Sequence, residues 1–164
     1  MTGPQFRAQH ALGPVVRGPA LVATDGFSAR YDLDRLQGVF SRPAHKLFGQ
    51  SYVDRVLVLD CAKGGVATAW MLHEMKARQM LPLAIVLNRA NPIMAQGAAL
   101  AGMALLAGFD GDITAQVPAG AVVEVDPVAG LLRIVDSSPP HPSAGTSGGA
   151  SAGMPAGYRK IHGP

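Results

Sequence analysis

The sequence predicts an α/β domain with two main helices, built either of three layers or around a barrel. Strand, helix, strand and helix patterns follow one another between residues 54 and 108, and short alternating strands come after Gly111. Because crossovers between parallel strands are right-handed, the loop "DCAKGG" (60–65) is expected at the carboxyl end of a strand. The 164 residues suffice for one domain with its own core.

The amino-terminal half is expected to hold two strands separated by a long loop. In the first strand, "PVVRGPALVAT" (14–24), Gly18 and Pro19 are typical of an edge or a bulge. A polar, irregular segment runs from Asp25 to Tyr52, and a loop of this length is more often functional than not. The run "DRVLVLD" (54–60) has the pattern of a strand covered on both faces.

Two helices are expected after that strand. The first, from Gly65 to Met80, has a narrow polar sector and is expected to pack on more than one side, with Glu74 and Arg78 paired at i,i+4. Its apolar face consists of Val66, Ala69, Trp70, His73, Ala77 and Met80. A buried strand, "LPLAIVLN" (81–88), follows, and Asn91 then caps the helix "IMAQGAALAGMALLAG" (93–108), whose small residues permit close approach to a neighbour.

The carboxyl-terminal part is expected to hold three strands: "ITAQVP" (113–118), "AVVEVDP" (121–127) and "LLRIVD" (131–136). Gly130 is expected to take a positive φ in the turn between the last two. The predicted folded domain therefore covers residues 12–136, after an N-terminal arm at residues 1–11. Residues 137–164 are rich in Ser, Gly, Pro and Ala, and such a composition predicts a disordered tail.

Composition argues against several classes of protein. The net charge of +3 comes from dispersed Lys and Arg, which argues against nucleic-acid binding. One cysteine, Cys61, permits neither an internal disulfide nor an iron–sulfur cluster, and no cluster of metal ligands is visible. No apolar run has the length of a membrane span, so a cytoplasmic protein is expected. Only 15% of residues are charged, which suggests a surface partly covered by another chain.

The order and spacing of five segments carry a resemblance to a known family. The segments are "RGPALVATDGFSARYD", "HKLFG", "DRVLVLDCAKGGVATAWMLHEM", "PLAIVLNRANPIMAQGAALAG" and "VEVDPVAGLLRIV". In this order they resemble the small subunit, or swivel domain, of the aconitase X group, which includes cis-3-hydroxy-L-proline dehydratase and mevalonate 5-phosphate dehydratase. The resemblance implies a swivelling β/β/α domain that closes over a separate large subunit. It also implies that the large subunit carries an iron–sulfur cluster and that this chain carries no cofactor.

The resemblance further implies a hydro-lyase acting on a small hydroxy acid with a carboxylate, and a serine base in the loop before the first helix. That loop here reads "AKGGVA" (62–67), without serine, and the segment near residue 28 reads "GFSAR" (26–30). Three readings therefore stay open: an enzyme subunit with another base, a non-catalytic regulatory subunit, or a base on the large subunit. The composition, rich in Ala, Gly and Pro, favours a hydroxyproline-like substrate over phosphomevalonate.

The candidate site residues follow from the residue pattern and from the family resemblance together. The expected catalytic residues are Lys63, Thr68 and His45, and the expected substrate-binding residues are Gly64, Gly65, Val66, Ser28, Phe27 and Arg30. Backbone amides at a helix start bind anions, and a lysine adds a point charge. The alternative is a glycine turn that only lets the helix pack on its strand. His73 is expected in the core or at an interface.

Overall fold

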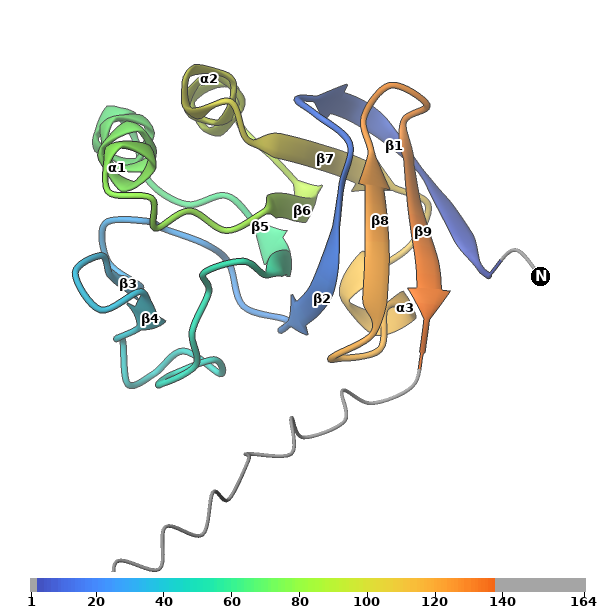
Figure 1. The fold of residues 1–164 in the computed structure, drawn as a ribbon, viewed down its shortest axis with the longest axis horizontal. Helices are drawn as coiled ribbons and strands as arrows, with labels where there is room; N and C mark the ends of the chain where they lie inside the picture. The colour runs from blue at the N-terminus through green and yellow to red at the C-terminus, as the bar shows by residue number, and fades with distance from the viewer. Residues whose placement is uncertain (1–2, 138–164) are drawn as a thin grey trace, which may run out of the picture.

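The computed structural model describes residues 3–137, which form a closed barrel flanked by helices (Figure 1). The barrel order is β1-β7-β6-β5-β2-β8-β9, and β3 and β4 form a separate hairpin. The strands are β1 (Gln5–Leu12), β2 (Val16–Val22), β3 (Leu33–Asp34), β4 (Val39–Phe40), β5 (Val56–Cys61), β6 (Ala84–Arg89), β7 (Ala104–Phe109), β8 (Val122–Asp126) and β9 (Leu131–Asp136). The helices are α1 (Val66–Ala77), α2 (Pro92–Ala101) and α3 (Ile113–Gln116). The predicted α/β fold with a barrel and two main helices is confirmed.

The barrel has a parallel half and an antiparallel half. Strands β2, β5, β6 and β7 pair in parallel, and β1, β8 and β9 close the barrel through antiparallel pairs. Side chains alternate along β5: Val56 and Val58 belong to one core cluster with Val123, while Leu57 and Leu59 pack with residues of α1 and α2 in a second cluster. Strand β5 is therefore covered on both faces, as predicted.

Strand β2 changes partners at Gly18 and Pro19. Its first half pairs with β8 and its second half pairs with β5, so β2 is not the edge strand that the sequence suggested. The irregularity lies on the neighbour, as a register shift between Val122 and Val123. Pro19 is tolerated inside a closed barrel because the pairing switches at this point.

Helix α1 buries a different stripe from the predicted one. Thr68, Ala69, Leu72 and Met75 face the core. Trp70 is 70% exposed and His73 is also exposed, so the placement of His73 in the core is wrong for this chain. The buried stripe includes the side of α1 that packs against α2, where Gly97 lies against Ala69 and Leu72. The predicted ion pair between Glu74 and Arg78 is confirmed at 3.0 Å.

Helix α2 begins as predicted and ends earlier. The side chain of Asn91 accepts a hydrogen bond from the Met94 amide at 2.8 Å, and Gly102 ends the helix with φ 65°. The predicted helix beyond Ala101 is wrong, because the apolar residues from Ala104 onward form β7. A fully apolar run does not distinguish a buried strand from a buried helix.

The small residues of α2 bring it close to α1, as predicted. A Cβ atom placed on Gly97 would lie 2.8 Å from the Cα of Ala69, so the two backbones nearly touch. Beyond Gly111, residues 113–116 form the short helix α3 instead of the predicted strand. Asp112 caps α3 through its carboxylate and so favours the helical turn. Strands β8 and β9 and the positive φ of Gly130 are confirmed.

The domain begins earlier than the boundary at residue 12 that the sequence predicts. Residues 5–12 form β1, which pairs with both β7 and β9 and closes the barrel. The strand was not predicted because its apolar residues are few and mostly small (Phe6, Ala8, Ala11 and Leu12), and strict alternation breaks after Ala8. The predicted tail at 137–164 lies outside the described residues except for Ser137. None of the helices in residues 3–137 is long and apolar enough to cross a membrane.

The long segment between β2 and β5 is packed onto the domain. Phe27, Phe40 and Tyr52 from this segment are fully buried in the cluster that also contains Leu72 of α1. The segment contains the β3–β4 hairpin and otherwise consists of turns. It therefore extends the layer next to α1 and brings distant residues beside the start of that helix (Figure 1).

Candidate functional site

The candidate site lies where β5 ends and α1 begins. Residues 62–65 connect the two elements, and the segment around Phe27 runs beside this loop in parallel. The Phe27 amide donates to the Cys61 carbonyl, and the Lys63 amide donates to the Phe27 carbonyl, both at 2.8 Å. These bonds hold Ser28 close to Lys63, although the two residues are 35 positions apart in the sequence.

The amino end of α1 is open. Gly65 is the N-cap residue with φ −115°, and no side chain among the described residues caps the helix. A Cβ atom placed on Gly65 would meet nothing within 4 Å, and Gly64, Gly65 and Val66 are all exposed. Unpaired amides and the positive end of a helix dipole favour an anion at such a position.

Two hydroxyl groups approach the loop from beneath. A Cβ atom on Gly64 would lie 2.7 Å from the Oγ1 atom of Thr68 and 3.5 Å from the Oγ atom of Ser28. Both Thr68 and Ser28 are only 2% exposed. The absence of a side chain at Gly64, whose φ is +99°, is therefore what lets these two hydroxyls lie under the loop.

Asp32 holds Ser28 in place. The carboxylate of Asp32 accepts a hydrogen bond from the Ser28 amide at 2.8 Å, and the Asp32 amide donates to the Ser28 carbonyl at 3.0 Å. A second carboxylate oxygen accepts from Arg42 at 3.4 Å. Asp32 is fully buried, so this reciprocal pair rigidifies the turn that presents Ser28. Sequence reasoning missed this role of Asp32, for which the four-residue spacing from Ser28 is the one local signal.

His45 lies against the backbone at Gly26. Its ring stacks on Phe40 at 4.6 Å, its Nε2 atom lies 3.0 Å from the Gly26 carbonyl, and its Nδ1 atom accepts from the Leu47 amide at 3.1 Å. Both ring nitrogens are thus occupied and the side chain is buried, so His45 fixes the backbone at Gly26.

Lys63 is exposed and lies across Gly26. A Cβ atom on Gly26 would meet the Lys63 side chain, so the missing side chain at Gly26 leaves room for the lysine stem. Near it, Asp25 accepts from the Lys46 amide at 2.7 Å. That bond, with the electrostatic attraction of His45, Lys46 and Lys63, holds the pKa of the Asp25 carboxyl below its usual value.

We expect the Asp25 network to weaken in acid. A depressed pKa in the folded state contributes stability that is present above the unfolded-state pKa, about 3.9, and is lost as the pH falls through the folded value. Thermal unfolding of wild type and Asp25→Asn between about pH 3 and 7 measures this. The wild type should be the more stable at neutral pH, and the difference should shrink below about pH 4. A difference independent of pH would contradict the assignment.

The remaining predicted residues are not brought together as a group. Phe27 is fully buried, so its backbone and not its ring lies at the loop. Arg30 is exposed, and its guanidinium lies 5.2 Å from the centre of the Tyr31 ring. Val66 is 61% exposed in the first turn of α1.

Another polar cluster at the carboxyl ends of β5 and β6 is structural. The Asn88 amide donates to Asp60 at 3.1 Å and to Asp112 at 2.7 Å, and its oxygen accepts from the Ile113 amide at 2.8 Å. The hydrogen bond from Asn88, with further help from Arg89, lowers the pKa of the Asp60 carboxyl. This cluster attaches α3 to the barrel.

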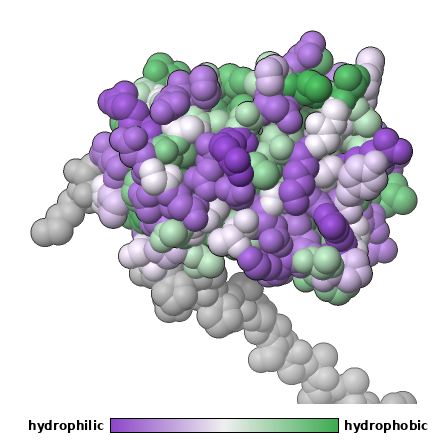
Figure 2. Space-filling view, turned by 180° about the vertical axis from the view of Figure 1, so that it is seen from behind, coloured by the Kyte–Doolittle hydropathy of each residue, from purple (hydrophilic) through white to green (hydrophobic). Residues whose placement is uncertain are grey.

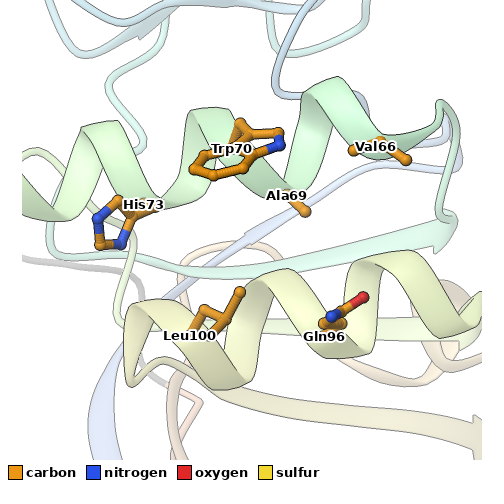
Figure 3. Close-up of a pocket in the computed structure, with 6 residues that line it drawn as sticks. All are labelled: Val66, Ala69, Trp70, His73, Gln96 and Leu100. Carbon is orange, nitrogen blue, oxygen red and sulfur yellow. The ribbon is translucent and has the colours of Figure 1, made fainter.

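The site is a surface and not an enclosed cavity. A groove of about 440 Å³ opens beside it between α1 and α2 (Figure 3). Residues 3–137 contain no group of three or more His, Cys, Asp or Glu side chains that could hold a metal ion. The arrangement can bind an anion at the helix start and bring two buried hydroxyls near it, but a second surface is needed to enclose a ligand.

A closed barrel with a parallel β–α–β flank is the fold of a swivel domain. The chain belongs to the aconitase X swivel domain family, whose model matches residues 5–134. The earlier resemblance and the swivel fold are thereby confirmed.

Individual relatives agree with this assignment. The phosphomevalonate dehydratase small subunit of Methanocella arvoryzae is 25% identical over 130 residues, which are 79% of this chain and 98% of the relative. The protein of the same description from Methanothermobacter thermautotrophicus is 31% identical over 117 residues, 71% of this chain and 89% of the relative. The crystal structure of Thermococcus kodakaraensis aconitase X in its holo form matches with a TM-score of 0.76 at 24% identity, covering 82% of this chain and all of the matched chain.

Proposed function

We propose that this chain is the small subunit of a two-chain, aconitase-X-type hydro-lyase that dehydrates a small hydroxy acid. The observation that carries the proposal is the open amino end of α1, with Lys63 beside it and the hydroxyls of Ser28 and Thr68 beneath. A large subunit would enclose this surface. The relatives named as phosphomevalonate dehydratase small subunits favour mevalonate 5-phosphate as the first substrate to assay, and cis-3-hydroxy-L-proline is the second.

In this proposal the helix start binds the substrate carboxylate. Removal of a proton next to a carboxylate places negative charge on the carboxylate oxygens, and fixed amide donors stabilise that charge without reorganising. Lys63 adds a charge from the exposed side of the loop. Ser28 and Thr68 are the hydroxyls near enough to the loop to orient the substrate or to relay a proton.

The proposal assigns no iron–sulfur cluster to this chain. The described residues offer no ligand set for one, and the sequence has a single cysteine. We place any such cluster on the large subunit and assign to this chain the binding and orientation of the substrate.

A non-catalytic regulatory subunit is the second candidate. The observation that favours it is the loop itself: Gly65, Val66 and Ala67 stand where the resemblance places a run of serines. The nearby hydroxyls of Ser28 and Thr68 are only 2% exposed. In this case the domain would cover the large subunit and control access without supplying a proton acceptor.

Reconstitution with the large subunit from the same genome tests the proposal. The complex should dehydrate mevalonate 5-phosphate or cis-3-hydroxy-L-proline, followed as formation of the unsaturated acid. Lys63→Ala should raise KM about tenfold, the value of one charge-assisted hydrogen bond. Lys76→Ala, in the last turn of the same helix, is the matched control and should change little. A complex that forms but turns over neither acid would favour the regulatory subunit.

A further inference from the structure

An apolar groove runs between the two main helices. It is lined by Val66, Ala69, Trp70, His73, Gln96 and Leu100, and we call these six residues the α1–α2 groove. Trp70 is 70% exposed, and Val66 and Leu100 are each 61% exposed. Figure 3 shows Trp70 and His73 on α1 above Leu100 and Gln96 on α2. Figure 2 shows hydrophobic surface along part of the upper edge, where these helices lie in Figure 1.

The groove has a rigid floor. The close approach of Gly97 to Ala69 holds the two helices together, and Ala69 is almost fully buried between them. Large side chains form the walls of the groove, and the small side chain of Ala69 forms its floor. The groove is therefore deep enough to receive a side chain from a partner. Interface hot spots are enriched in tryptophan and lie in well-packed pockets, so an exposed tryptophan beside a preformed hollow is typical of one.

The groove continues into the candidate site. Val66 lines the groove and is also the first residue of α1, next to Gly65 at the open helix start. A chain that covers the helix start therefore reaches the groove with little further extension. None of the six lining residues is Asp, Glu, Lys or Arg. A charged partner segment would find no opposite charge there, so the groove favours an apolar segment.

We propose that the α1–α2 groove is the docking site for an apolar segment of the large subunit. This inference rests on the proposed function, which requires a large subunit over the adjacent helix start. Continuity through Val66 favours that partner over a second copy of this chain, because a second copy in the groove would crowd the helix start that the substrate needs. Docking by both contacts would also fix the orientation of the swivel domain over the large subunit.

Trp70 makes the inference directly testable, because it is the one tryptophan in the sequence. The full chain labelled with 5-fluorotryptophan has a single fluorine signal, which should shift and lose its solvent isotope effect when the unlabelled large subunit is added. In binding titrations, Trp70→Ala and Leu100→Ser should each weaken the complex about tenfold or more. Val128→Ser is the matched control, since Val128 is an apolar residue in the β8–β9 turn that is 88% exposed, and it should bind as wild type does.

The outcomes separate the inference from the proposed function. A wild-type complex in which the fluorine signal is unchanged and Trp70→Ala binds normally would overturn the groove assignment alone. Failure of the wild-type chain to bind the large subunit would overturn both. A signal that shifts with protein concentration in the isolated chain, or on deletion of residues 138–164, would assign the groove to a second copy or to the carboxyl-terminal segment and would also contradict the inference.

Discussion

Replacement of Gly64 by alanine is expected to lower the free energy of unfolding by about 2 kcal/mol and to abolish activity of the reconstituted complex. Gly64 has φ +99°, where a side chain is strained, and the new Cβ atom would lie 2.7 Å from the Thr68 hydroxyl. Relief of this contact requires the loop to lift or Thr68 to turn. Either movement would displace the amides at the start of α1 from the hydroxyls beneath them.

The neighbouring glycine provides the matched control. Gly65 has φ −115°, and a Cβ atom there would meet nothing within 4 Å. Gly65→Ala should therefore change stability by less than about 1 kcal/mol, mostly through loss of a favourable N-cap residue. Urea unfolding followed by circular dichroism gives the free energies, and the dehydration assay gives the activities. Equal effects of the two substitutions would show that Gly64 has no special role.

Asp32→Ala is expected to cost about 3 kcal/mol of stability, because it removes a buried acceptor and leaves a buried amide without its partner. The carboxylate accepts from the Ser28 amide at 2.8 Å and from Arg42 at 3.4 Å, and the residue is fully buried. The turn that presents Ser28 would lose its main restraint. Activity of the complex should fall together with stability, and it should stay low at temperatures where the variant is still folded.

An exposed aspartate serves as the control for Asp32. Asp110 lies on the surface after β7, and Asp110→Ala should stay within about 0.5 kcal/mol of wild type. Differential scanning calorimetry of both variants gives the change in stability. If Asp32→Ala matched Asp110→Ala, the hydrogen bonds around Ser28 would contribute nothing to the fold and the proposed positioning role would fail.

Much of the fold could be predicted because its signals are local. The buried run of β5, the Asn91–Pro92 helix start and the turn at Gly130 each depend on residues within a few positions of one another. The wrong predictions of secondary structure also came from local patterns. The residues of β7 were assigned to α2 because an apolar run has no period, and residues 113–116 were read as a strand although Asp112 could cap a helix.

The candidate site was predicted only in part. The open helix start at Gly64 and Gly65 followed from the sequence, because glycines before an apolar helix expose amides. The structure adds the role of Asp32 and the location of Ser28, which depend on a parallel pairing between residues near 27 and 62. It also places His45 in a buried position, with its Nε2 atom 3.0 Å from the Gly26 carbonyl.

The sequence by itself determined the approximate positions of β2, β5, α1, β6, β8 and β9, the start of α2, and the presence of a glycine loop before the first main helix. The tertiary structure decided that β1 closes the barrel, that Trp70 faces solvent, and that the hydroxyls of Ser28 and Thr68 both lie close to Gly64. The physical reason is the range of the interactions. Caps, turns and periodicity act over a few residues, whereas strand closure and the exposed face of a helix depend on which distant segments pack together.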